Sequence, residues 1–116
     1  MEYALLIYHD ETVVPPMGSG EREELFAAYR AYSESLRESD SYRGAVKLGS
    51  TTSATSVRVR NGRALTTDGP FAETKEQLAG LYVVSCENLD EALERASRLP
   101  GARFGTIEVR PIDFRG

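Results

Sequence analysis

The segment SVRVRNGRALTTDGPFAETKEQLAGLYVVSC, residues 56–86, decides how this chain is organised. Its first part holds two strand-like runs around Asn61-Gly62, the strongest short-range hairpin signal, because both turn residues accept positive φ. Its last part, residues 81–86, is apolar and short and predicts a strand. The run TDGPFAETKEQ at 67–77 lies between them and exceeds the usual connection of about 4–6 residues, which is typical of functional loops.

The flanking sequence supplies further strands and two helices. Strands are expected at residues 3–8, 45–48 and 104–110, and helices at 21–38 and 89–99. The apolar stripes of the helices are Leu25, Tyr29, Tyr32 and Leu36 with Phe26 beside them, and then Leu89, Ala92, Leu93 and Ala96. Asn88 and Glu91 form a capping pair for the second helix. The order β-α-β, inserted hairpin, β-α-β predicts an α+β, ferredoxin-like antiparallel sheet with two helices on one face.

Two of the expected strands are apolar on both sides. In the first strand Tyr3, Leu5 and Ile7 point one way, while Ala4, Leu6 and Tyr8 point the other. The strand at 81–86 repeats this pattern. Two helices cover only one face of a sheet, and large exposed apolar surfaces usually mark interaction sites. We therefore expect a homodimer in which two sheets pack face to face with two-fold symmetry.

Composition limits the classes of function. The 116 residues correspond to one domain, residues 1–116, with a net charge of −4. This acidic balance argues against nucleic acid as a partner, because phosphates need a basic face. No segment approaches the roughly 18 apolar residues of a membrane span, and the N-terminal run does not have the form of a signal peptide. The single cysteine, Cys86, forms no internal disulfide and reads as a small apolar group, so we expect a cytoplasmic protein.

Candidate site residues cluster in and near the loop. Asp68 is the first choice, either as a base or substrate-orienting carboxylate or as a turn residue that bonds local amides. Phe71 is a core or dimer-interface anchor or lines a pocket. Glu73, Lys75 and Glu76 bind a polar ligand or form a solvated surface.

His9 is the only histidine and the second catalytic candidate. It ends the first strand, and an imidazole titrates near neutral pH. The alternative is a hydrogen-bonded surface residue. We expect no metal site and no cofactor, since the chain has one histidine, one cysteine and no phosphate-cradling glycine loop.

The sequence also resembles a known family. TDGPFAETKEQLAG at 67–80 is similar to the defining motif of the DGPF group of YciI-related proteins, and three other stretches agree: YALLIYHDE, SVRVRNGRALTTDGPF and NLDEALERASRLPGARFGTIEVRPI. The resemblance implies a dimeric α+β barrel. It also implies a cleft, for which a catalytic His/Asp pair has been proposed in relatives, some of which eliminate chloride from aromatic substrates. That histidine lies in the first helix of the relatives; the helix at 21–38 has none here, so the pair does not carry over.

Two functions follow as expectations. The first is binding of a small molecule in a cleft near the DGPF loop, with cofactor-free, lyase-like acid/base chemistry by Asp68 and, second, His9. The other is a non-catalytic accessory or regulatory dimer. DGPF proteins are often encoded near sigma factors of the extracytoplasmic-function type, so the resemblance links this second function to a sigma-factor pathway.

Overall fold

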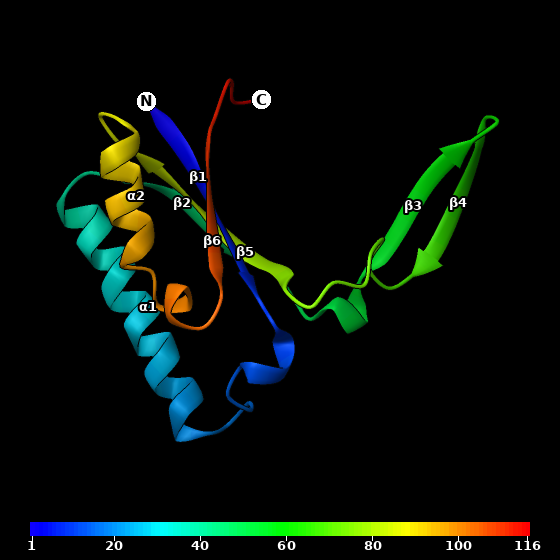
Figure 1. Ribbon diagram of the computed structural model, residues 1–116, viewed down its shortest axis with the longest axis horizontal. Helices are drawn as coiled ribbons and strands as arrows, with labels where there is room; N and C mark the ends of the chain where they lie inside the picture. Colours follow the sequence, from blue (N-terminus) through cyan, green and yellow to red (C-terminus); the bar gives the residue numbers. More distant parts are fainter.

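A four-stranded antiparallel sheet forms the centre of the structure, with two helices on one side and a separate hairpin projecting on the other (Figure 1). The structure is a computed structural model that describes residues 1–116. The sheet contains β1 (Glu2–His9), β2 (Tyr42–Lys47), β5 (Gln77–Ser85) and β6 (Thr106–Pro111), in the spatial order β2-β5-β1-β6. The other elements are α1 (Gly20–Glu38), α2 (Leu89–Ser97), β3 (Thr55–Arg60), β4 (Arg63–Asp68) and the 3-10 turns η1 (Glu11–Val13), η2 (Thr51–Ser53) and η3 (Pro100–Arg103).

The predicted α+β, ferredoxin-like arrangement is confirmed, with corrections at three strand boundaries. β2 begins at Tyr42 because Tyr42 already pairs with Val84 of β5. β5 begins at Gln77, opposite His9, so the end of the expected loop belongs to the sheet and the loop itself spans 69–76. β6 begins at Thr106 because the residues before it form and cap η3.

Side-chain caps set the start of each helix. Ser19 Oγ accepts a hydrogen bond from the Arg22 amide at 3.1 Å at the start of α1. Asn88 Oδ1 accepts one from the Glu91 amide at 2.9 Å, which confirms the capping function predicted for Asn88 in α2. Acidic residues in both first turns face the positive end of the helix dipole. Neither helix is long and apolar enough to cross a membrane.

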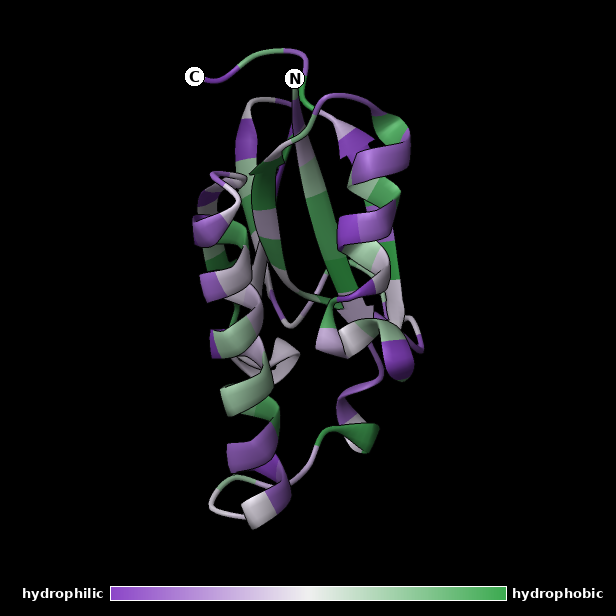
Figure 2. Cartoon of the chain, turned by 90° about the vertical axis from the view of Figure 1, so that its left-hand side faces the viewer, coloured by the Kyte–Doolittle hydropathy of each residue, from purple (hydrophilic) through white to green (hydrophobic).

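The core lies between the helices and one face of the sheet. Leu5, Val84, Leu36 and Leu99 are its most deeply buried large side chains. Figure 2 faces the helix layer and shows hydrophobic strand segments between two helices that alternate hydrophobic and hydrophilic residues. Ala92 and Ala96 of α2 are buried, whereas Leu89 and Leu93 are 49% and 47% exposed. The apolar stripe predicted for this helix is therefore wrong for its two leucines. The nine-residue helix packs through its two alanines, and its leucines lie on the flank.

The opposite face of the sheet carries no helix. Register places on it the apolar side chains of Ala4, Leu6, Tyr8, Val46, Leu78, Leu81 and Val83. We call this set the open face. All of these side chains are partly or largely exposed in the single chain. The sheet is therefore apolar on both sides, as the sequence pattern indicated.

The hairpin does not join the main sheet. β3 and β4 pair only with each other, through a turn in which Asn61 (φ 53°) and Gly62 (φ 73°) take positive φ. This confirms the hairpin predicted from the Asn-Gly dipeptide. At its base the Gly69 amide donates to the Ala54 carbonyl at 2.7 Å. We call β3, β4 and their turn the arm.

Replacing Leu36 tests where the core lies. Leu36→Ala removes a fully buried side chain and should lower the free energy of unfolding by about 3 kcal/mol, because a cavity replaces packed methyl groups. Leu93→Ala, in the half-exposed leucine of α2, is the matched control and should cost less than about 1 kcal/mol. Urea unfolding followed by circular dichroism measures both, and equal losses would contradict this description of the core.

Candidate functional site

A cavity of about 430 Å³ opens between α1 and the ends of β1, β2 and β5. Its size is within the range of small-molecule sites, roughly 300–1,000 Å³. Twelve of its 20 lining residues are hydrophobic, among them Ile7, Leu25, Phe26, Tyr29 and Phe104. The charged or titratable groups are few and come from different elements: His9, Glu11, Arg22, Tyr29, Lys47 and Tyr82.

His9 is half-buried in the cavity wall. As the last residue of β1 it shares the helix-side face with Leu5 and Ile7, and its ring lies 5.8 Å from the ring of Phe104. The Nδ1 atom is buried and has no hydrogen-bond partner. Burial is the main cause that lowers the pKa of His9 below its usual 6.5, and Lys47 lowers it further, while Glu11 opposes the shift. A pKa below 6.5 keeps the imidazole mostly neutral at pH 7.

Two cationic side chains lie in the same lining. Arg22, in the first turn of α1, holds its guanidinium 5.0 Å from the centre of the Phe26 ring and donates from Nη1 to the Pro15 carbonyl at 3.1 Å. Its Nε is buried without a partner. Lys47, at the end of β2, is exposed and bonds weakly to the Leu48 carbonyl at 3.4 Å. Both cations thus retain hydrogen-bond donors for a ligand.

The one acidic side chain of the cavity is already engaged. Glu11 accepts from the Thr51 amide and from Ser50 Oγ, each at 2.8 Å, and these bonds lower its pKa. The contacts join η1 to η2 and fix the rim. With His9 neutral, the lining carries two positive charges and one negative, a net +1 in a chain of net −4. The charged side chains of the lining thus leave one positive charge in excess.

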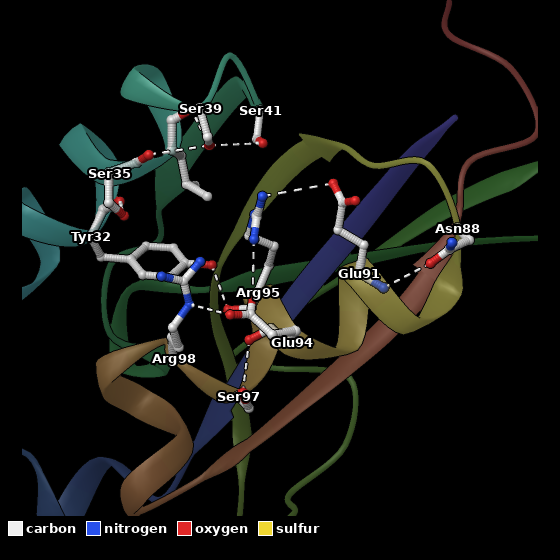
Figure 3. A network of polar contacts seen from close by, with 11 residues as sticks. Tyr32, Ser35, Ser39, Ser41, Asn88, Glu91, Glu94, Arg95, Ser97 and Arg98 are labelled. Carbon is white, nitrogen blue, oxygen red and sulfur yellow. Dashed lines mark hydrogen bonds and ion pairs between the residues drawn. The ribbon is translucent and has the colours of Figure 1, made fainter.

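A second polar network lies between α1 and α2, away from the cavity, and its charged groups are paired with one another (Figure 3). The Tyr32 hydroxyl donates to the Arg95 carbonyl at 2.7 Å, and burial raises the pKa of Tyr32. Arg95 and Arg98 each lie 3.0 Å from Glu94. The Tyr32 bond joins the two helices, whereas the ion pairs lie within α2 and its C-cap, and we assign the network a structural role.

The structure separates the residues predicted from the sequence. His9 lines the cavity, whereas none of Asp68, Phe71, Glu73, Lys75 and Glu76 does. Asp68 is exposed at the end of β4, opposite Thr55, and Phe71 is 80% exposed. Glu76 accepts from Thr106 Oγ1 at 2.8 Å, and Glu73 and Lys75 are exposed. Phe71 is therefore not a core anchor in the single chain, while its other roles and those proposed for the four charged residues stay predictions.

Sequence reasoning missed Arg22, Lys47, Glu11 and Tyr29 as cavity residues. For Arg22 a signal was present, because it precedes Leu25 by three residues and Tyr29 by seven, which places a charge on the apolar stripe of α1. For Lys47 and Glu11 no pattern along the chain indicates their proximity, because the sheet register and the η1–η2 contact bring them together.

Metal and thiol chemistry have little support in the side-chain geometry. No three His, Cys, Asp or Glu side chains lie close enough to hold a metal ion. Cys86 is free and buried, and burial raises the pKa of its thiol.

The fold and the cavity define a class: a ferredoxin-like α+β protein with a ligand-sized pocket between its first helix and its sheet. A family model for the YCII-related domain matches residues 1–113, and the chain belongs to this family. It is also similar to uncharacterized protein R00369 of Rhizobium meliloti (strain 1021), at 40% identity over 114 residues, which covers 97% of this chain and 92% of that protein. The family predicted from the sequence is thereby confirmed.

The lowered pKa of His9 predicts a specific pH dependence of stability. Between the folded pKa and the unfolded value near 6.5 the unfolded chain binds more protons, so the free energy of unfolding falls as pH drops through this window. Because His9 is the only histidine, its NMR imidazole signals titrate without ambiguity and should give a pKa below 6.5. His9→Gln should flatten the loss of stability between pH 7.5 and about 5.5, measured by urea unfolding. A titration midpoint above 6.5 would contradict the buried placement.

Proposed function

We propose that this chain binds a small organic anion with an apolar or aromatic body in the cavity beside His9. The observation that carries the proposal is a ligand-sized, mostly apolar cavity whose lining brings His9 together with two cations, Arg22 and Lys47. A carboxylate or phenolate fits this combination, because Arg22 and Lys47 supply charge-assisted donors. The ring of Phe26 and the other apolar side chains fit the remainder of such a ligand.

The same arrangement supports cofactor-free acid/base chemistry. A neutral imidazole in reach of a bound ligand accepts a proton near neutral pH. The cations stabilise the negative charge that develops when a proton leaves carbon, as in an elimination or isomerisation. In this proposal His9 is the base and Arg22 and Lys47 are the electrostatic groups. Asp68 stays a candidate catalytic carboxylate, but in the single chain it lies outside the cavity that contains His9.

The finer family placement and the cellular setting also belong to the proposal. TDGPFAETKEQLAG at 67–80 supports membership of the DGPF group. A free, buried Cys86 is compatible with the reducing cytoplasm. The exposed apolar side chains of the arm favour a second function, a non-catalytic accessory or regulatory dimer, for which a sigma-factor pathway is the setting that the DGPF group suggests.

A homodimer completes the proposed assembly. The open face offers a continuous apolar surface over three neighbouring strands, β2, β5 and β1. A second copy would cover it with an identical surface, and two sheets pack about 10 Å apart. Burial of apolar area at about 25 cal/mol per Å² drives such association.

Thermal-shift measurements with benzoate and benzamide test the ligand class. The two probes share an aromatic ring, but only benzoate carries a charge, so benzoate should raise the melting temperature and benzamide should not. At ten times its dissociation constant a ligand stabilises by about 1.4 kcal/mol, a shift of about 5 °C for a chain of this size. Lys47→Gln and His9→Gln should each weaken the benzoate shift. Equal shifts by both probes, or a shift that is lost only in Asp68→Asn, would move the site away from this cavity.

Sedimentation equilibrium tests the sheet-to-sheet dimer. Leu81→Lys places a charge at the centre of the open face and should convert a micromolar dimer into a monomer, because the buried lysine would have no partner. Leu89→Lys, on the exposed flank of α2, is the control and should leave the mass unchanged. A wild-type monomer at micromolar concentration would refute the dimer while leaving the cavity assignment intact.

A further inference from the structure

The arm makes few packing contacts with the rest of its own chain. It is a two-stranded sheet outside the main sheet, and its strand side chains from Val57 onward are all exposed. Val57, Val59 and Leu65 are 64%, 62% and 52% exposed. An isolated two-stranded hairpin is at best marginally stable in water. The arm therefore needs a surface to pack against.

The two faces of the arm differ in chemistry. Register and alternation place Val57, Val59, Ala64 and Thr66 on one face, which we call the valine face. The other face carries Arg58, Arg60 and Arg63 together with Leu65. One side is thus apolar and free of charge between the turn and the Thr55–Asp68 pair, and the other is basic. An amphipathic hairpin of this kind fits against a surface with one face and keeps its arginines at the margin or in solvent.

Charge indicates what that surface is. The arm, residues 55–68, carries three arginines and one aspartate, a net +2. The whole chain has a net charge of −4, so the remaining residues carry −6. Two arms repel each other, whereas an arm is attracted to the body of the chain, meaning the main sheet with its helices. Its own body is out of reach, because the arm projects away from it (Figure 1).

We propose that the arm packs, through its valine face, on the body of a second copy of this chain. This inference builds on the proposed dimer and adds a reciprocal exchange of arms to the sheet-to-sheet contact. The arm projects on the side of the open face, the side where the second copy would lie (Figure 1). Six residues per strand at about 3.3 Å each make it about 20 Å long, enough to reach past a partner sheet packed about 10 Å away. Phe71, 80% exposed just after the arm, enters the same contact.

Limited trypsin digestion of the full chain tests this contact, because Arg58, Arg60 and Arg63 make the arm a cleavage site. The fragments are assigned by mass spectrometry, and the digestion is run from well below to well above the dissociation constant measured by sedimentation. Cleavage after these arginines should slow at least about tenfold as the dimer forms, since a packed strand does not enter a protease. A cleavage rate that stays constant while the dimer forms would overturn the proposal, and so would a chain that is monomeric throughout.

A matched pair of variants separates the arm from the sheet contact. Val57→Thr/Val59→Thr keeps β-branched residues in the strand but makes the valine face polar, and should raise the dimer dissociation constant about tenfold. Leu65→Thr, on the basic face, should change it less than about threefold. All three sites are exposed in the single chain, so the protomer should keep its circular dichroism spectrum. If the double variant dimerises like the wild type, the arm proposal fails, while the sheet contact and the cavity are tested separately by Leu81→Lys and benzoate.

Discussion

The central constraint in this structure is that a sheet with two apolar faces has helices for only one of them. β1 and β5 are the inner strands, and both carry apolar side chains on each of their two faces. α1 and α2 bury the face that carries Leu5 and Val84 to 0% exposure. The open face is left partly exposed, which an isolated protomer tolerates poorly, because apolar area removed from water is the main source of stability. The arm lies on the same side and has a second exposed apolar surface. Both features therefore indicate that a partner binds on the side of the open face.

The cavity arises where the helix layer is least complete. α2 has nine residues and packs through alanines, so much of the covering falls to the 19-residue α1. At the start of α1 the side chains over the sheet are Arg22, Leu25 and Phe26, which leave a cavity where tighter packing would fill it. The hydrogen-bonding groups at this end, on His9 and Arg22, are not all satisfied within the chain. The physical reason to regard the cavity as a binding site is its ligand-like size together with the few charged groups, from separate elements, that meet in its apolar lining.

The sequence was sufficient for the fold and only partly sufficient for the site. Period-two and helical patterns, the Asn61-Gly62 turn and the Asn88 cap are local signals, and each element that they predict exists. The cavity depends on contacts between distant segments, such as Glu11 with Thr51, that no local pattern encodes. Leu89 and Leu93 show a related limit, since periodicity identifies a stripe but not how deeply a short helix docks. Charged residues are dense along the chain around Asp68, yet the cavity is lined by His9, which no charge cluster marks in the sequence.

The Asp68–Phe71 motif has a structural role that is independent of any catalytic one, because it lies at the base of the arm. Gly69 has a φ of +99°, which residues with a side chain rarely adopt, and Pro70 restricts the residue before it. The Gly69 amide donates to Ala54, and the Gly69 carbonyl accepts from Ser56 Oγ at 2.9 Å, so both ends of the arm are tied at this glycine. The motif therefore fixes the direction in which the arm leaves the body. If the arm binds a second copy, a sequence requirement at Gly69 and Pro70 follows from assembly alone, and Asp68 at the arm's base would lie near the partner rather than near its own cavity.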